Sequence, residues 1–505
     1  MVEAREYQKE IFENAKDKNT LVVLPTGLGK TLIALMLTKD RLEKFPRSKI
    51  LIMAPTRPLI EQHYYTFQKT LGDLYAEYVL ITGKIKSEDR IKKMWTATII
   101  FSTPQCIAND LKRGVISLED FSLLVFDEAH RAVKDYSYVY VSNKYKMQGI
   151  NKRVLALTAS PGHEEEKIKK ICETLDIEHI EIRNRESKDV KEYIQEMKLD
   201  IVRVDMPPEF ELIKDKIKEI YAKKIEELQN RKILFDRPTK TNLLELQKRI
   251  FNAVNSGNKN FNLLKGLSLC VQAIKLQYAL ELLETQGITP FYLYLQKLLK
   301  ESEEGRKASL AITKTEIFKS VYLVTAKLKA ENFEHPKQEK LIEVLNEILG
   351  EKNKKIIVFT QYRDTVNKIK ERLNQNKINA EIFVGQAKRR NIGMNQKEQK
   401  IILDKFKENK INVLISTSIG EEGLDIPEVD AVIFYEPIPS AIRQIQRRGR
   451  TARLKPGKVI VLMTRRTRDE VYYYASKAKE RKMNTAIESL KQKFTKKQQS
   501  NLNGF

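Results

Sequence analysis

The sequence predicts an α/β fold of two parallel-sheet domains with an all-helical insert between them. Three observations predict it: strand–helix alternation over residues 1–205, helical spacing alone over 206–330, and alternation again over 331–470. Strands that are apolar along their whole length are typical of parallel sheets covered by helices on both faces. The remaining residues, 471–505, are rich in lysine and predict a basic C-terminal tail that is frayed at its end.

Short apolar runs supply the expected strands. In the first domain they are 21–25, 49–55, 77–83, 98–104, 123–129 and 153–159, with helices expected over 31–45 and 58–71. In the second domain they are 354–361, 380–385, 411–417, 431–437 and 457–463. Between the domains, apolar residues recur at helical spacing with a charged opposite face, as in 209–235, so the insert is expected to contain helices only.

Charge is the most informative feature of the composition. The 505 residues include 92 Lys and Arg against 67 Asp and Glu, a formal net charge of +25. Such an excess repels itself and is commonly matched by a polyanion, most often nucleic acid, although a merely basic surface has the same composition.

Three scattered cysteines exclude a disulfide framework or a clustered zinc site. No signal peptide and no apolar run of about 20 residues is present, so a cytosolic or nuclear protein is expected.

A glycine-rich segment, LPTGLGKT at 24–31, follows the first strand and opens the first long helix. Glycines 27 and 29 allow backbone N–H groups to approach a polyphosphate, and the helix N-terminus adds its positive dipole. Lys30 would reach the β- and γ-phosphates, and the Thr31 hydroxyl would reach Mg²⁺. The alternative is a glycine turn between two elements.

A second segment, VFDEAH at 125–130, ends another apolar strand. Such a strand delivers Asp127 and Glu128 to the carboxyl edge of the sheet, where metal-assisted ATP hydrolysis takes place. Asp127 would hold Mg²⁺ through water, and Glu128 would polarise the attacking water. Acidic residues after a strand can also be a helix cap, but the neighbouring phosphate loop favours catalysis.

These segments, with TAS at 158–160 and QRRGRTAR at 446–453, resemble the ordered motifs of superfamily 2 DEAH-box helicases over residues 1–470. Weaker segments fit the same order: 5–8, 54–62, 81–83, 102–105, 358–365 and 416–430. With its helical insert, the chain is most similar to the archaeal Hef helicase portion, which is related to the FANCM fork-remodelling proteins. The resemblance implies two RecA-like motor domains (1–205 and 331–470), a thumb-like insert, and ATP with Mg²⁺ as cofactors.

Site residues follow from this resemblance. It implies that ATP lies between the motor domains, with Gln446 near the γ-phosphate and Arg450 and Arg453 as arginine fingers that complete catalysis by Lys30, Asp127 and Glu128. The implied ATP-binding residues are Arg5, Gln8, Thr26, Gly27, Gly29, Lys30, Thr31 and Asp425. His130 and Ser160 would couple hydrolysis to the domain interface. Arg447 and Arg448 are either part of this site or form salt bridges only.

Nucleic acid is expected across both motor domains. The implied contacts are Arg57, Thr82, Gly83, Thr103, Gln361 and Thr417, residue types that bind phosphates without reading sequence. Thr103 could instead only cap a helix. In the insert, basic pairs such as Lys223 and Lys224 could grip duplex arms, and the aromatic cluster at 291–295 either packs the helical core or stacks on bases.

We therefore expect an ATP-dependent DNA helicase or translocase that acts on forked, branched or single-stranded DNA in replication-fork repair. Two alternatives stay open: an ATPase stimulated by double-stranded RNA, and an ATP-gated clamp or scaffold that does not separate strands. Hef-type proteins often carry a nuclease with an E-R-K-x-x-x-D signature. Here ERK at 480–482 lacks the aspartate, so a nuclease domain or partner is expected to lie outside this chain.

Overall fold

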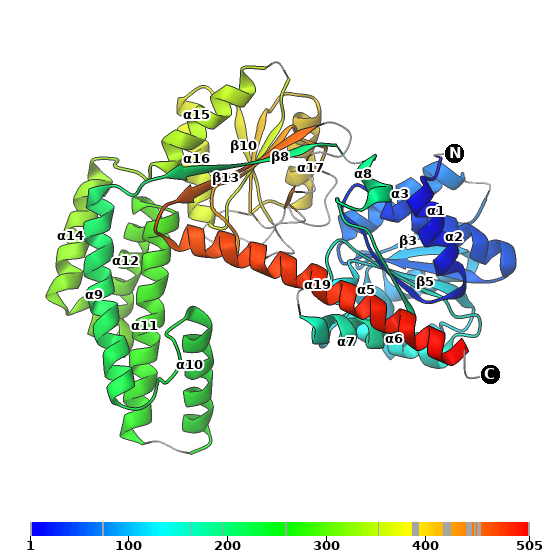
Figure 1. Cartoon of the computed structure of the whole chain (residues 1–505), viewed down its shortest axis with the longest axis horizontal. Helices are drawn as coiled ribbons and strands as arrows, with labels where there is room; N and C mark the ends of the chain where they lie inside the picture. Colours follow the sequence, from blue (N-terminus) through cyan, green and yellow to red (C-terminus); the bar gives the residue numbers. More distant parts are fainter. Residues whose placement is uncertain are drawn as a thin grey trace.

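The computed structural model describes residues 3–72, 75–162, 164–193, 195–257, 260–351, 353–385, 393–417, 426–440, 447–448, 451 and 456–502. Within them the chain forms two sheet domains, a helical insert that projects from the second domain, and a long terminal helix that runs back to the first domain (Figure 1). The predicted fold class is confirmed. None of the described helices is long and apolar enough to span a membrane.

In the first domain, the described strands form one parallel sheet in the order β3-β4-β2-β5-β6-β1-β7. These strands are β1 (Thr20–Val23), β2 (Lys49–Met53), β3 (Tyr78–Ile81), β4 (Ile99–Ser102), β5 (Phe121–Asp127), β6 (Val154–Thr158) and β7 (His179–Ile182). The surrounding helices are α1 (Glu6–Asp17), α2 (Lys30–Lys44), α3 (Arg57–Leu71), α4 (Ser87–Thr96), α5 (Pro104–Lys112), α6 (Ser137–Gln148), α7 (Glu165–Leu175) and α8 (Lys188–Lys191). One hydrophobic cluster fills each face of the sheet, which explains the apolar central strands.

The second domain repeats this design with the strand order β10-β11-β9-β12-β13-β8, again parallel. Its strands are β8 (Met197–Val204), β9 (Ile356–Phe359), β10 (Ala380–Phe383), β11 (Val413–Ser416), β12 (Ala431–Phe434) and β13 (Gly457–Thr464). Its helices include α15 (Lys337–Leu349), α16 (Arg363–Gln375) and α17 (Gln396–Lys407). The insert contains α9 (Pro208–Asn230), α10 (Lys240–Asn255), α11 (Phe261–Thr285), α12 (Ile288–Glu303), α13 (Lys307–Thr313) and α14 (Glu316–Ala330).

The structure differs from the expected domain boundaries at β8. This strand lies within residues 1–205, yet it pairs with β13 of the second sheet over its whole length, from Met197 opposite Gly457 to Val204 opposite Thr464. The prediction assigned it to the first domain because the strand precedes the insert in the chain. A parallel strand can join a sheet distant in sequence, and only the pairing partner decides which sheet it joins.

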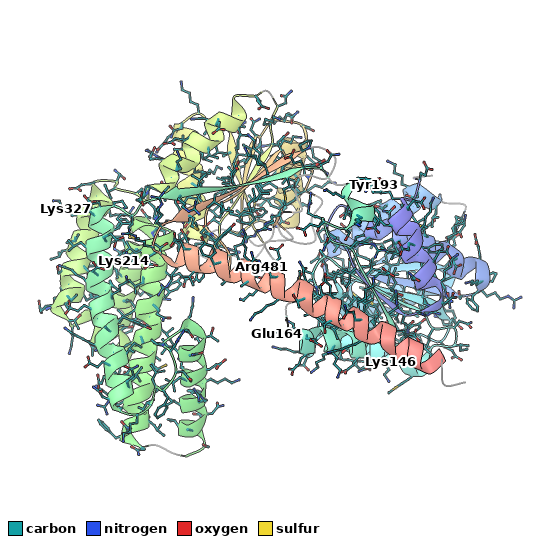
Figure 2. The ribbon with its side chains drawn as sticks, viewed as in Figure 1. Lys146, Glu164, Tyr193, Lys214, Lys327 and Arg481 are labelled. Carbon is teal, nitrogen blue, oxygen red and sulfur yellow. The ribbon has the colours of Figure 1, made fainter. Side chains whose placement is uncertain are left out.

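The segment 471–505, predicted as a basic tail frayed at its end, is helical as far as Leu502, because residues from 468 onward form the long helix α19 (Arg468–Leu502). Tyr473 near its start packs into the core of the second domain. Further along, Met483, Ala486, Ile487 and Leu490 are buried in the core of the first domain. The middle of α19, around Arg481, spans the space between the two domains (Figure 2). One helix therefore belongs to both hydrophobic cores.

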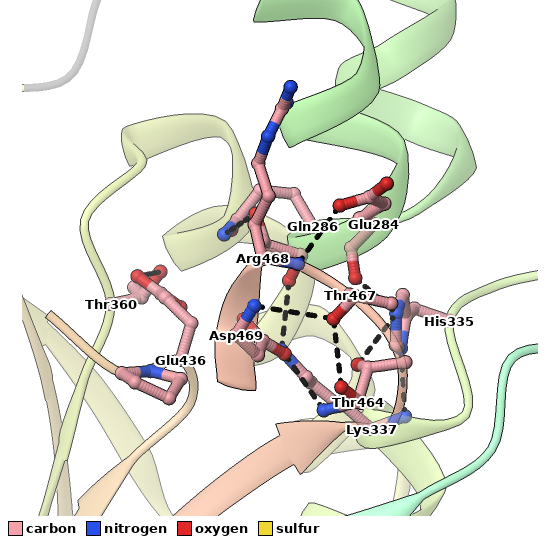
Figure 3. Close-up of polar contacts among 12 residues, drawn as sticks. Glu284, Gln286, His335, Lys337, Thr360, Glu436, Thr464, Thr467, Arg468 and Asp469 are labelled. Carbon is pink, nitrogen blue, oxygen red and sulfur yellow. Dashed lines mark hydrogen bonds and ion pairs between the residues drawn. The ribbon is translucent and has the colours of Figure 1, made fainter. Parts of the chain in front are cut away.

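A buried polar joint connects the insert to the second domain (Figure 3). Lys337 of α15 forms a fully buried ion pair with Asp469 of α19 and donates to the backbone oxygen of Thr285 at the end of α11. The ring of His335 lies 3.1 Å from the backbone oxygen of Glu284, and burial lowers the pKa of His335 to about 3, so its ring is neutral. The insert is thus bonded to the second domain through its longest helix.

Breaking the Lys337–Asp469 pair should be costly. Lys337→Met leaves the Asp469 carboxylate buried without its cation, and we expect a loss of about 3–5 kcal/mol in the free energy of unfolding. Urea unfolding followed by circular dichroism measures it. The control is Lys340→Met on the same helix, which loses only an exposed pair with Glu343 and should change stability by less than about 0.5 kcal/mol. Equal losses in the two variants would contradict the buried pair's role.

Stability should also depend on pH through Glu436, which follows β12. Burial raises the pKa of Glu436 to about 7, against the lowering effect of Lys337. Between about pH 4.5 and 7 the folded state holds a proton that the unfolded state has lost, so stability falls as pH rises through this window. The Glu436→Gln variant lacks this titration, so its free energy of unfolding relative to wild type should rise by roughly 3 kcal/mol between about pH 4.5 and 7. The surface variant Glu343→Gln should show the same pH dependence of stability as wild type. If Glu436→Gln also shows the wild-type pH dependence, the prediction is refuted.

Candidate active site and nucleic-acid interface

The predicted phosphate loop lies between β1 and α2, at the carboxyl edge of the first sheet. Gly29 precedes α2 with φ +78°, and a Cβ atom there would lie 2.2 Å from Nε2 of Gln8. The backbone conformation therefore favours glycine at this position, and any side chain here would also displace the amide of Gln8. Lys30 begins α2, and its Nζ donates to the backbone oxygen of Leu24 at 2.8 Å. Its ammonium group thus lies within the loop that would cradle a phosphate.

Helix α1 supports this loop from one side. Both Nε2 of Gln8 and the hydroxyl of Tyr7 donate to the backbone oxygen of Leu28, at 3.1 and 2.9 Å. The guanidinium of Arg5 stacks over the ring of Tyr193 at 4.8 Å and donates to the Tyr7 hydroxyl at 3.2 Å. The structure therefore brings Gln8 against the phosphate loop, whereas Arg5 is linked to the loop through Tyr7. Tyr7 and Tyr193 are contributors that sequence reasoning missed.

The carboxylate of Asp127, at the end of β5, is buried and hydrogen-bonded through both oxygens. Oδ1 accepts the backbone N–H of Glu128 at 2.9 Å, and Oδ2 lies 2.8 Å from Nε2 of His63. Burial opposes ionisation, but His63, Lys30 and the Glu128 amide together lower the pKa of Asp127 below its usual value. Asp127 is thus ready to act as an anion at neutral pH.

Glu128 adopts a left-handed backbone conformation, with φ 51°, which is strained for a residue other than glycine. Its Oε2 atom lies 3.3 Å from Nδ1 of His130, and the same ring nitrogen lies 3.3 Å from the hydroxyl of Thr158, the last residue of β6. Ser160 donates through its hydroxyl to Sδ of Met483 in α19, at 2.8 Å. The predicted coupling residues therefore form a chain from the Glu128 carboxylate to the helix shared by the two domains.

The chemistry of these groups fits Mg²⁺, which takes oxygen ligands. The Thr31 hydroxyl, in the first turn of α2, and the Asp127 carboxylate, which would act through water, both lie at the carboxyl edge of the first sheet. Among the described residues, no cluster of three or more His, Cys, Asp or Glu side chains could hold a metal. A site that shares its ion with the phosphates of a nucleotide needs no such cluster.

Four predicted residues, Asp425, Gln446, Arg450 and Arg453, lie outside the described residues. Of their neighbours, Arg447 is buried with its guanidinium 4.7 Å above the ring of Phe359. Arg448 pairs with Glu480 of α19 at 3.5 Å, so its salt bridge crosses to another element. A cavity of about 280 Å³ adjoins this pair and is lined by both domains and α19, including Thr26, Ala159, Arg448, Glu480 and Met483.

The predicted nucleic-acid residues fall into two groups. Arg57, Thr82, Gly83 and Thr103 line one hollow of about 510 Å³, together with Lys84 and, from α17 of the second domain, Asn395 and Lys397. Thr103 precedes α5 and accepts no capping bond from its backbone; its hydroxyl instead donates to Sγ of Cys106 in the first turn of α5, at 3.3 Å. Gln361 and Thr417 instead follow the neighbouring strands β9 and β11. Sequence reasoning missed α17, although its Asn395–Glu398 capping box was visible in the sequence.

The aromatic cluster of the insert is part of its core. Phe291 and Tyr294 are buried, and Tyr292 stacks on Tyr322 with ring centroids 5.5 Å apart. Base stacking by Phe291 and Tyr294 is therefore excluded in this fold. Other aromatic side chains of the insert are exposed instead: Phe235 by 83%, Phe261 by 76% and Phe251 by 53%.

Three family models match the chain: DEAD/DEAH box helicase over residues 5–168, an RNA helicase helical bundle over 209–332, and helicase conserved C-terminal domain over 336–455. A Methanocaldococcus jannaschii protein, named provisionally as an ATP-dependent RNA helicase, is 41% identical over 97% of this chain and 61% of its own length. The ATP-dependent DNA helicase fml1 of Schizosaccharomyces pombe is 35% identical over 92% of this chain and 57% of its own length.

The chain thus spans about three fifths of the length of these curated relatives. Among solved structures, the Hef helicase domain of Pyrococcus furiosus is 44% identical and superposes with a TM-score of 0.71, covering 94% of this chain and 98% of that domain. Both the ordered motifs and the two-sheet architecture with its insert agree with that match. The chain belongs to the superfamily 2 DEAD/DEAH-box helicases, as a relative of the Hef helicase domain.

Proposed function

We propose that this chain is an ATP-dependent DNA helicase or translocase that acts on forked or branched DNA in replication-fork repair. The observation that carries the proposal is the hollow lined by Arg57, Thr82 and Gly83 of the first domain and Lys397 of the second. Hydroxyl groups, backbone amides and cations there suit a sugar–phosphate backbone and read no base. When two domains that contact the same DNA strand move relative to each other, the spacing between their contacts changes. A translocase requires such a change in order to step along DNA.

ATP would bind between the domains. Lys30 and the Gly27–Gly29 backbone would hold the phosphates, Arg5 and Gln8 the adenine, and Asp425 the ribose. Mg²⁺, when bound through Thr31 and Asp127, would neutralise phosphate charge. Glu128 would orient and deprotonate the attacking water, while Gln446, Arg450 and Arg453 would complete the site from the second domain. His130 and Ser160 would relay the state of this site to α19, because a series of contacts runs from Glu128 through His130, Thr158 and Ser160 to Met483.

DNA as the substrate is supported by relatives named as ATP-dependent DNA helicases, including two of Schizosaccharomyces pombe. The insert adds the exposed aromatic side chains of Phe235, Phe251 and Phe261, and α10, which carries Phe251, also carries the exposed cations Lys248 and Arg249. Aromatic and basic groups together suit unpaired bases at a fork. We place this activity in the cytoplasm, or in the nucleus of a eukaryotic cell, with a nuclease domain or partner supplied from outside this chain.

Double-stranded RNA is the second candidate substrate. It is favoured by the names of the Methanocaldococcus jannaschii relative and of the helical-bundle family, both of which refer to RNA helicases. The two substrates differ in their groove shape and in the 2′-hydroxyl, so the same motor could be stimulated by either. A direct comparison of how strongly forked DNA and double-stranded RNA stimulate ATP hydrolysis decides between them.

Nucleic-acid-stimulated ATP hydrolysis tests the proposal. Steady-state ATPase should rise with forked DNA more than with single-stranded DNA or duplex RNA. Lys30→Ala should lower the stimulated rate by about two orders of magnitude or more, because it removes the cation that faces the phosphates. The control is Lys39→Ala on the same helix, which loses an exposed pair with Glu43. A preference for duplex RNA would replace the DNA proposal, and indifference to every nucleic acid would refute both.

The hollow itself is tested by DNA affinity. Arg57→Ala and Lys397→Ala should each weaken binding of single-stranded DNA whatever its sequence, and each should reduce the slope of log K against log salt by about 0.7. Fluorescence anisotropy over a salt series measures both effects. Lys340→Ala, on the remote helix α15, is the control. Unchanged slopes in both hollow variants would place the DNA elsewhere on the molecule.

A further inference from the structure

His63 is a buried histidine that no predicted role includes. It lies on α3, is 6% exposed, and its Nε2 atom is 2.8 Å from Oδ2 of Asp127. Because Asp127 ends β5 and His63 belongs to the helix after β2, the contact joins two neighbouring strand–helix units of the first sheet. The N–H of the ring is the natural donor to this carboxylate.

The same helix begins in the nucleic-acid hollow. Arg57 is the first residue of α3 and lines that hollow with Thr82 and Lys397. His63 is the sixth residue after Arg57 in this helix, which corresponds to a rise of about 9 Å. An α-helix of this length moves as a rigid rod, so a displacement of its first turn by bound DNA is transmitted to the His63 ring.

A second bond ties the same two segments together. The hydroxyl of Tyr138, which is fully buried, lies 2.7 Å from the backbone oxygen of Asp127 and 3.2 Å from that of Met53. Met53 is the last residue of β2, just before the loop that leads to Arg57. Asp127 is therefore linked to the segment 53–63 in two ways: directly, by its carboxylate at His63, and indirectly, by the Tyr138 hydroxyl that lies between the backbone oxygens of Asp127 and Met53.

We propose that His63 is a positioning residue: its ring holds the Asp127 carboxylate in the orientation needed for hydrolysis and makes that orientation respond to nucleic acid bound at the start of α3. The proposal rests on the proposed ATPase function. Oδ1 of Asp127 is held by the Glu128 amide, so the His63 bond to Oδ2 fixes the remaining rotation of the carboxylate. Each oxygen keeps a lone pair for a water molecule on Mg²⁺.

Two amide variants provide a matched test. The side-chain nitrogen of glutamine can reach the place of Nε2, whereas that of asparagine falls short. His63→Gln should therefore keep the bond, and His63→Asn should lose it while remaining polar. The control for a histidine–carboxylate pair in the same domain is His179→Asn, since Nε2 of His179 lies 2.7 Å from Oε1 of Glu181 on β7.

Three measurements separate positioning from stability. With saturating single-stranded DNA, His63→Asn should lower kcat about tenfold with KM for ATP within about twofold of wild type, and His63→Gln should recover most of the rate. A second measurement does not depend on turnover: fluorescence anisotropy gives the affinity for DNA, once without nucleotide and once with Mg²⁺, ADP and beryllium fluoride. Nucleotide should change this affinity in wild type and His63→Gln, and much less in His63→Asn. Thermal melting without nucleotide reports the fold.

The proposal is overturned if His63→Asn and His63→Gln behave alike, if His179→Asn shows the same losses, or if the loss of rate simply follows the loss of melting temperature. Failure of the proposed function has a different signature, because a wild type that no nucleic acid stimulates refutes DNA-driven hydrolysis. In that case the basal kcat of His63→Asn against His63→Gln still decides whether His63 positions Asp127.

Discussion

Parallel pairing of the strands is the constraint on which the rest of this structure depends. All strands of a parallel sheet end on the same edge, so every loop that follows a strand is delivered there. In the first domain this edge collects the phosphate loop after β1, the Arg57 segment after β2, Thr103 after β4, and the strand-ending residues Asp127 of β5 and Thr158 of β6. The candidate ATP-site residues and the candidate nucleic-acid contacts thus share one edge, and short bonds such as His63 to Asp127 connect the two groups.

Two elements connect parts that the chain order separates. Strand β8 leaves the first domain and completes the second sheet, and α19 leaves the second domain and completes the core of the first. Between them the insert is bonded to the second domain by the buried joint around Lys337 and Asp469. A buried ion pair is a precise orienting contact rather than a large source of stability. The insert is therefore expected to move with the second domain as the cleft opens and closes.

Much of the fold was predictable because buried parallel strands must be apolar on both faces. Runs such as 123–129 and 431–437 therefore identify strands directly, and the return of the pattern after residue 330 identifies the second domain. The candidate phosphate loop and the acidic pair at 127–128 were predictable for a related reason, since their residue types and spacing are demanded by phosphate and water. His63, Tyr138 and Lys397 were not, because a histidine, tyrosine or lysine on a helix has many uses and no spacing that distinguishes them.

By itself, the sequence determined the two α/β domains, the helical insert, the family resemblance and the chemical identity of the ATP-site candidates. These follow from local patterns: burial on both faces, helical periodicity, and glycines before a helix. Only the tertiary structure decided that β8 pairs with β13, that α19 is shared by two cores, and that Phe291 is buried while Phe235 is exposed. The physical reason is that pairing and packing partners are chosen by contacts between distant segments, and an apolar or charged residue does not encode which segment it will meet.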